Sequence, residues 1–211
     1  LVVGFRSIKP AALRTVWQTG RVPRVVMVIT FLGTLAMPLQ YAVLLGVATA
    51  VLLLQFQGAN RIRLVELVPV EGGVPPAQPA PKQLASRRVT ALQPFGSLFY
   101  AAARTFEENL PAADQARQAA VIFLFRGYDE FGSTMIGVLD RYARTLQGNG
   151  GRLLLAGVSK GVLAQLERTG LIGLIGRENV FLEQPQWGAA ANQALASAEA
   201  WLETLPPAEP T

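Results

Sequence analysis

The sequence predicts two units, a membrane α-helical hairpin and a soluble α/β domain with a mostly parallel sheet and helices packed on it. No residue between positions 25 and 60 is charged. Glycine and proline crowd residues 72–81, which is typical of a linker. Beyond residue 88, apolar runs alternate with amphipathic segments, the pattern of alternating strands and helices. We therefore expect a membrane unit over residues 1–63, a linker over 64–87, an α/β domain over 88–205 and a tail over 206–211. Within the linker, the alternative is an edge strand at 65–70 followed by a loop over 72–86.

Basic residues surround the charge-free segment. Residues 1–63 contain no Asp or Glu, and the chain as a whole carries a net charge of +5. A basic protein can bind nucleic acid, but such proteins gather their charge on a soluble face. Here the excess flanks an apolar stretch, so we expect no nucleic-acid partner. The basic residues concerned are Arg6, Lys9, Arg14, Arg21, Arg24, Arg61 and Arg63.

The chain contains neither Cys nor His. Disulfides, thiol nucleophiles, imidazole bases and nearly all transition-metal sites are therefore excluded. The adjacent acids Asp129 and Glu130 resemble a carboxylate pair, but no other residue supports chemistry there, and we interpret them as solvated loop residues. We predict no enzymatic activity, no catalytic residue, no metal site and no cofactor.

A proline divides the charge-free segment. As one helix, residues 25–56 would measure about 48 Å, whereas the hydrocarbon core of a bilayer is about 30 Å thick. Pro38 disfavours a continuous helix, which leaves pieces at 25–36 and 39–56. We therefore predict a broken hairpin that enters the bilayer and turns back. One tilted span is the alternative.

The flanking charges predict the topology of this hairpin. Arg21 and Arg24 precede it, and Arg61 and Arg63 follow it. Positive charge is retained in the cytoplasm, so both ends are expected there. A turn within the bilayer needs protein around it, and we expect membrane helices of the same chain before Leu1. The other predicted partner is the lipid itself.

Residues 10–21 predict an amphipathic helix at the membrane surface. Pro10 suits a first helical position. Trp17 lies among arginines, a composition found in interfacial helices. A connecting helix packed on neighbouring protein is the alternative.

The C-terminal part has the pattern of an α/β domain. The apolar run at 119–125 is typical of a central strand that is buried on both faces. Ser133 and Ser159 are suited to cap the helices that follow their respective strands. The predicted strands are 89–93, 119–125, 153–156 and 180–182, with a turn and a further strand over 95–99. The predicted helices are 101–110, 133–146, 159–169 and 188–205.

Several motifs make this part resemble the STAS domain, which sulfate transporters share with anti-sigma-factor antagonists. The resemblance lies in the strings GSLFY, AAVIFLF, GSTMI, GGRLLLAGV, LERTGL and ENVF, which begin at positions 96, 119, 132, 150, 166 and 178. The N-terminal part resembles the last membrane segments of SulP-type anion transporters. That resemblance lies in VGFR from position 3, ITFLGTL from 29 and LGV from 45.

The resemblance implies the C-terminal fragment of a secondary inorganic-anion transporter for sulfate or bicarbonate. It further implies a homodimer, a multi-pass location in the inner cell membrane, and a cytoplasmic STAS domain that regulates transport or supports the dimer. The anion would bind outside this fragment. The alternative is a membrane-tethered STAS regulatory module of the anti-sigma-factor-antagonist type.

Two positions are candidate sites. In the antagonists a Ser or Thr at a loop-to-helix turn is phosphorylated, and the matching residue here is Thr134, with Ser133 beside it. The family usually has Asp just before this site, whereas this chain has Gly132. The alternative is a plain helix cap at Ser133.

The second candidate site is the turn that contains Ser159 and Lys160. Its backbone N–H groups and the lysine side chain suit an anion or a nucleotide phosphate. The alternative is a simple strand-to-helix turn with no ligand.

Overall fold

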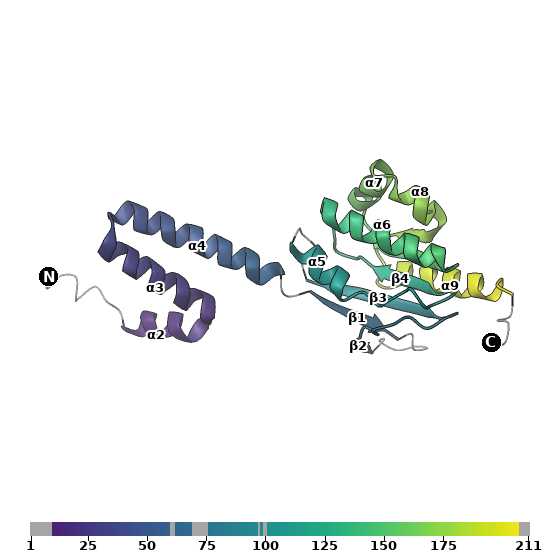
Figure 1. The fold of residues 1–211 in the computed structure, drawn as a ribbon, viewed down its shortest axis with the longest axis horizontal. Coiled ribbons are helices and arrows are strands. Elements are labelled where there is room, and N and C mark those ends of the chain that lie inside the picture. Colours follow the sequence, from purple (N-terminus) through teal and green to yellow (C-terminus); the bar gives the residue numbers. More distant parts are fainter. Residues whose placement is uncertain (1–9, 60–61, 69–75, 97, 99–100, 207–211) are drawn as a thin grey trace. The chain divides into compact units, whose positions relative to one another are not determined.

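The computed structural model describes residues 10–59, 62–68, 76–96, 98 and 101–206 (Figure 1). The chain divides into two compact units, residues 1–58 and residues 59–211. The first is helical and the second is α/β, in the order that the sequence predicts. Each unit is described by itself below.

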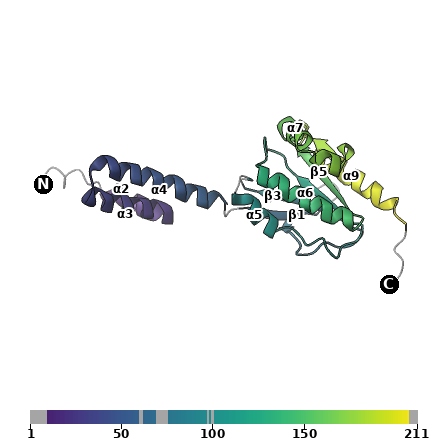
Figure 2. The same ribbon diagram turned by 45° about the horizontal axis from the view of Figure 1, so that its top comes forward.

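The described residues of the first unit form the helices α2 (Pro10–Thr19), α3 (Arg21–Ala36) and α4 (Leu39–Ala59). The predicted break at Pro38 is confirmed, because α3 ends two residues before it and α4 begins directly after it. Helices α3 and α4 then lie antiparallel, side by side (Figure 2). Gly33, Ala42 and Gly46 are buried, and a Cβ on Gly33 would lie 3.5 Å from that of Ala42. Small residues therefore let the two helices approach closely.

Large apolar side chains cover the outside of this helical pair. Phe31, Leu35 and Leu39 are 62%, 73% and 70% exposed. Among the residues that the structure describes, no helix has both the length and the apolarity of a bilayer-crossing span. The membrane hairpin consequently stays a prediction.

Helix α2 ends at Thr19, two residues before the predicted end. Trp17 and Arg24 connect it to α3. The guanidinium carbon of Arg24 lies 5.6 Å from the centroid of the Trp17 ring, and its Nε donates to the Trp17 carbonyl oxygen. Trp17 is 53% exposed, and the location of α2 at a membrane surface stays a prediction.

The second unit is built on a six-stranded mixed sheet of order β2-β1-β3-β4-β5-β6. Strands β3 to β6 are parallel to one another, whereas β1 and β2 are antiparallel to their neighbours. The predicted parallel core is therefore present, with an antiparallel extension. Residues 97 and 99 of the turn and strand predicted over 95–99 lie outside the described residues. The strands are β1 (Arg63–Leu67), β2 (Ala77–Pro79), β3 (Val89–Phe95), β4 (Ala120–Leu124), β5 (Arg152–Val158) and β6 (Val180–Leu182).

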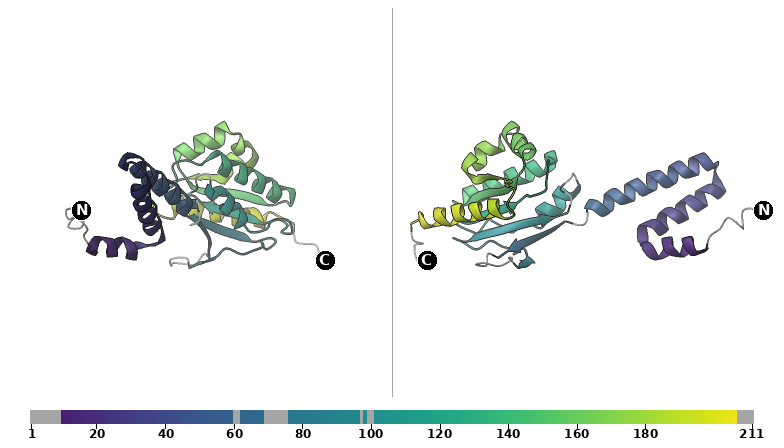
Figure 3. Two further views of the ribbon diagram at one scale, coloured as in Figure 1. Left: turned by 60° about the vertical axis from the view of Figure 1, so that its left-hand side comes forward. Right: turned by 180° about the vertical axis from the view of Figure 1, so that it is seen from behind.

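Helices cover both faces of this sheet (Figure 3). On one face α9 packs its alanines 190, 194 and 198 against Ile122 and Leu154. On the other face Phe123 and Leu155 contact the main core, to which α5, α6, α7 and α8 contribute. Successive residues of β4 and β5 thus enter opposite cores, as strand geometry requires. The helices are α5 (Ala101–Glu108), α6 (Ser133–Gly148), α7 (Lys160–Arg168), α8 (Leu171–Ile175) and α9 (Ala189–Glu203).

The structure differs from the prediction in the segment 64–87. This segment was expected to be a linker, but it supplies most of β1 and all of β2, and Leu84 is 7% exposed in the main core. The alternative of an edge strand at 65–70 is nearer to the structure, although β1 lies inside the edge strand β2. Residues 69–75 of the predicted linker lie outside the described residues. Pro79 is compatible with a strand because β2 is at the edge of the sheet, where a missing N–H costs little. The proline content is therefore compatible with an edge strand and does not by itself indicate a linker.

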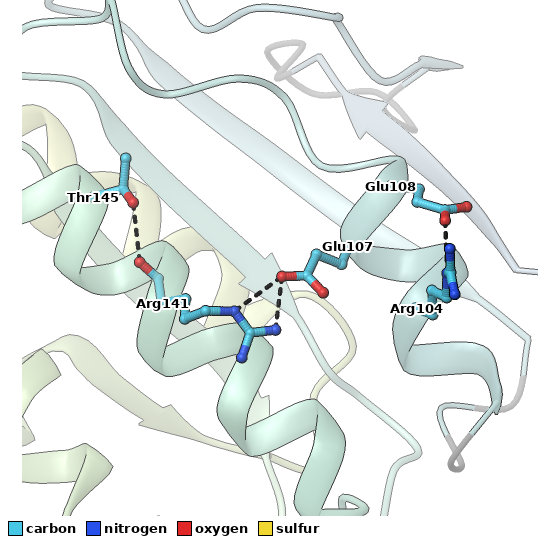
Figure 4. A network of polar contacts seen from close by, with 5 residues as sticks. All are labelled: Arg104, Glu107, Glu108, Arg141 and Thr145. Carbon is cyan, nitrogen blue, oxygen red and sulfur yellow. Dashed lines mark hydrogen bonds and ion pairs between the residues drawn. The ribbon is translucent and has the colours of Figure 1, made fainter.

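Helices α5 and α6 are joined by an ion pair (Figure 4). Nε and Nη2 of Arg141 donate to Oε1 of Glu107, at 3.0 and 2.7 Å. Within α5, Arg104 pairs with Glu108 one turn later at 3.0 Å. The first of these pairs connects elements from different parts of the sequence and helps to hold α5 against α6.

Candidate regulatory site

The first candidate site is the N-terminus of α6. Ser133 is the first residue of the helix, and Gly132 is its N-cap. The interpretation of Ser133 as the cap is therefore wrong, since its hydroxyl lies one position past the place from which a cap accepts an N–H bond. The side chains of Ser133 and Thr134 are both exposed. In the part of the chain that the structure describes, neither hydroxyl makes a hydrogen bond.

The second candidate site is the N-terminus of α7. Ser159 is the N-cap, and its Oγ accepts from the backbone N–H of Val162 at 3.2 Å, so this predicted cap is confirmed. The same hydroxyl donates to the carbonyl oxygen of Asp129 at 3.3 Å. The Ser159 hydroxyl thus has a structural role both as a hydrogen-bond acceptor and as a donor. Lys160 is the first helical residue, and its side chain is exposed.

An open hollow of about 370 Å³ lies beside Lys160. Arg126 also lines it, but its Nε lies 3.4 Å from Glu183 and its Nη1 donates to the carbonyl oxygen of Gln184. Within the described ranges Lys160 has no ion pair. The hollow therefore contains one cation that is available to an anionic ligand.

The two candidate sites are connected through the loop 126–132. The side chain of Gln165, in α7, accepts from the N–H of Phe131 at 2.8 Å and donates to the carbonyl oxygen of Phe131 at 3.3 Å. A Cβ on Gly161 would lie 2.6 Å from the carbonyl oxygen of Asp129, so α7 approaches this loop closely. Helix α7 therefore holds the residues that lead into α6. Sequence reasoning missed Gln165, because no motif marks a pairing across 34 positions.

Aromatic side chains hold the other side of the same loop. Phe131 is 4% exposed, and its ring centroid lies 4.7 Å from that of Phe125. The Tyr128 hydroxyl donates to the carbonyl oxygens of Pro94 and Gly96 at 3.1 and 2.8 Å. Burial raises the pKa of Tyr128, so this phenol remains a hydrogen-bond donor at neutral pH. The loop is thus held between β3 and α7.

This region presents exposed hydroxyl and carboxylate groups. The exposed hydroxyls of Ser133 and Thr134 lie at the start of a 16-residue helix, where a negative charge is favoured. Asp129 and Glu130 are also exposed. Within the described residues no group of three side chains of the metal-binding types has the arrangement of a metal site.

Comparison with known protein families decides the identity of this region. The model of the STAS domain matches residues 81–184. The chain contains a STAS domain. The match covers both candidate sites and strands β3 to β6, and it confirms the domain type that the sequence motifs indicate.

Solved structures share the fold of this chain beyond the STAS domain itself. The murine anion transporter Solute Carrier 26 family member A9, in its inward-facing state, matches 92% of this chain with a TM-score of 0.66 at 19% identity. A second structure, of SLC26A9, matches 90% with a TM-score of 0.68 at 18% identity. A sulfate transporter family protein from Wolinella succinogenes matches 55% of this chain and 88% of its own, with a TM-score of 0.46 at 26% identity.

The first two structures are much longer than this chain, which spans 31% and 32% of them. At such identities the likeness establishes a common fold, and it extends over the helical unit as well as the STAS domain. No curated protein matches the sequence.

Proposed function

We propose that this chain is the C-terminal part of a SulP-type secondary transporter of an inorganic anion. One observation carries the proposal: an apolar helical pair is followed directly by a STAS domain, and this arrangement aligns with an anion transporter over nine-tenths of the chain. The substrate class would be sulfate or bicarbonate, bound by membrane helices outside these residues. The STAS domain would regulate transport or support a homodimer.

In this proposal, α3 and α4 form a hairpin within the inner cell membrane. The exposed apolar side chains on both helices support it, because isolated exposed groups are common in soluble proteins but a continuous apolar surface is not. Residues 25–60 also lack any charge that a bilayer would exclude. Lipid and further helices of the same chain would cover these side chains, and the STAS domain would lie in the cytoplasm.

Anion uptake by the complete reading frame tests the proposal. The frame would be expressed in bacteria that lack endogenous sulfate uptake, and the entry of radiolabelled sulfate and of bicarbonate would be measured separately. Uptake of either anion above an empty-vector control is expected. Normal membrane insertion with no flux of either anion would contradict the transporter.

The second candidate function is a membrane-tethered STAS regulator of the antagonist type. The exposed hydroxyl of Thr134 favours it, since the motif resemblance matches Thr134 to the residue that is phosphorylated in those proteins, and Ser133 beside it is exposed as well. A reading frame that starts near Leu1, together with a kinase that phosphorylates Thr134, would support this function. A frame with many preceding apolar spans would support the transporter.

We also propose that Thr134, with Ser133 beside it, is a regulatory position in the transporter. A phosphate there would be stabilised by the free N–H groups and the dipole of α6. Phosphopeptide mass spectrometry of the protein from its native cells tests this role. Phosphate confined to other residues would contradict it.

A ligand role for Ser159 and Lys160 is a separate proposal. The hollow beside the unpaired Lys160 supports an anionic ligand, such as a nucleotide phosphate. Titration of the full chain with a nucleoside triphosphate, compared with Lys160→Gln, would measure it. Equal affinities for the two proteins would rule out a contact from Lys160.

A further inference from the structure

We propose that Gln165 is a positioning residue that couples the N-terminus of α6 to α7. The inference rests on the proposed regulatory role of Thr134 and states how a charge there would be transmitted. The essential observation is that one side chain pairs with both backbone groups of Phe131, at 2.8 and 3.3 Å. Phe131 directly precedes Gly132, the residue that caps α6.

The arrangement around this pairing leaves the loop little freedom. The Phe131 ring is 4% exposed in the main core, and Gln165 holds the backbone of the same residue. Two residues earlier, the carbonyl oxygen of Asp129 is bonded by Ser159 and lies against Gly161. Two positions of α7 and its N-cap Ser159 therefore hold the residues that lead into the first turn of α6.

A charge at Thr134 acts on this turn because it interacts with the exposed N–H groups and the helix dipole. Stabilising the turn fixes Gly132 and Phe131, and an ordered Phe131 backbone favours the bound conformation of Gln165. Such linkage is reciprocal, so anything that orders α7 also orders the start of α6. Lys160 lies at the N-terminus of α7. The linkage between α6 and α7 therefore couples the two candidate sites energetically.

Hydrogen exchange on the full chain in detergent micelles tests the coupling through a double-mutant cycle. The four proteins are the wild type, Thr134→Glu, Gln165→Leu and the double variant. Amide exchange is measured for residues 132–137 and for residues 163–168. In the wild-type background, Thr134→Glu is expected to slow exchange in both segments, by about two- to twelvefold, the equilibrium factor of one ordinary hydrogen bond.

In the Gln165→Leu background, the same substitution is expected to slow exchange at 132–137 while leaving 163–168 unchanged. Gln147→Leu is the matched control, because Gln147 also donates its side-chain amide to a backbone carbonyl oxygen, that of Leu174, away from this loop. The control should retain the full effect of Thr134→Glu on α7. If Gln165 has only a structural role, Gln165→Leu would change amide exchange in α7 by the same factor with and without Thr134→Glu.

The outcomes separate this inference from the proposal on which it rests. If Thr134→Glu in the wild-type background slows exchange at 132–137 but leaves exchange in α7 unchanged, the coupling is overturned and Thr134 remains a regulatory position. No change in either segment would overturn both. An effect on α7 that persists in the double variant would assign the coupling to a different contact and overturn the role of Gln165.

Discussion

Thr30 in α3 lies directly against Gly46 in α4. A Cβ at Gly46 would overlap the Thr30 hydroxyl, which donates to the carbonyl oxygen of Val26 at 2.8 Å. The Thr30 hydroxyl thus has its hydrogen-bond partner within its own helix. Gly46 has no side chain that would collide with it. Two helices that pack through small residues in this way need no large apolar side chain at their contact.

Gly46→Leu is therefore expected to separate α3 from α4. The interaxial distance should rise by up to about 2 Å, the range over which helix spacing varies with side-chain size. Because the chain has no Cys, nitroxide labels at Leu35→Cys and Leu44→Cys report the spacing by pulsed electron paramagnetic resonance.

Ala48→Leu is the matched control for this prediction, since Ala48 is exposed. It should leave the distance distribution unchanged. An identical distribution for Gly46→Leu and the wild type would contradict the close contact.

Tyr142 should make the stability of the domain depend on pH in the alkaline range. Burial raises the pKa of this phenol above its ordinary value of 10.0. Above pH 10 the unfolded phenol ionises while the folded one stays protonated, so the free energy of unfolding falls as the pH rises. Tyr142→Phe removes this contribution, and its stability should fall less steeply between pH 9 and 11.

The same variant loses the hydrogen bond from the Tyr142 hydroxyl to the carbonyl oxygen of Pro111, of 3.0 Å. At pH 7 this should reduce the free energy of unfolding by about 1–2 kcal/mol, because a buried acceptor is left unpaired. Urea denaturation of the full chain at several pH values measures both effects. Parallel pH profiles for the variant and the wild type would refute the assignment to Tyr142.

Helix α9 should not tolerate a larger side chain at Ala194. This residue is fully buried against the sheet among other alanines. Ala194→Leu is expected to destabilise the packing of α9 by about 1–3 kcal/mol through overpacking. Faster amide exchange in α9 would report the change, and Ala196→Leu, at an exposed position of the same helix, should have little effect.

Two ion pairs of different burial should differ in their contribution to stability. Glu107 and Arg141 are both well exposed, and Glu107→Gln is expected to cost less than about 1 kcal/mol. Glu66 is 8% exposed and pairs with Arg88 at 3.1 Å. Glu66→Gln should cost about 1–3 kcal/mol, since the charge-assisted bond to a buried carboxylate is weakened. Equal thermal midpoints for the two variants would show that burial does not matter here.

Local patterns were sufficient to predict much of this protein. The run at 119–125 became β4, because a buried central strand requires continuous apolar residues. Pro38 separated α3 from α4, because proline lacks the N–H that helix continuation needs. Ser159 was found as a cap from its position between a strand and a helix. Each of these results depends on residues that are neighbours in sequence.

Long-range contacts decided the rest. The antiparallel addition of β1 beside β3 turned a predicted linker into part of the sheet, and prolines alone do not reveal which edge is free. The pairing of Gln165 with Phe131 depends on where the loop 126–132 meets α7 after both have packed on the sheet. The sequence by itself determined the parallel strands β3 to β6, the helices other than α8, and the family motifs. Only the tertiary structure decided which side chains meet, because hydrogen bonds across 34 positions depend on the packing of whole elements.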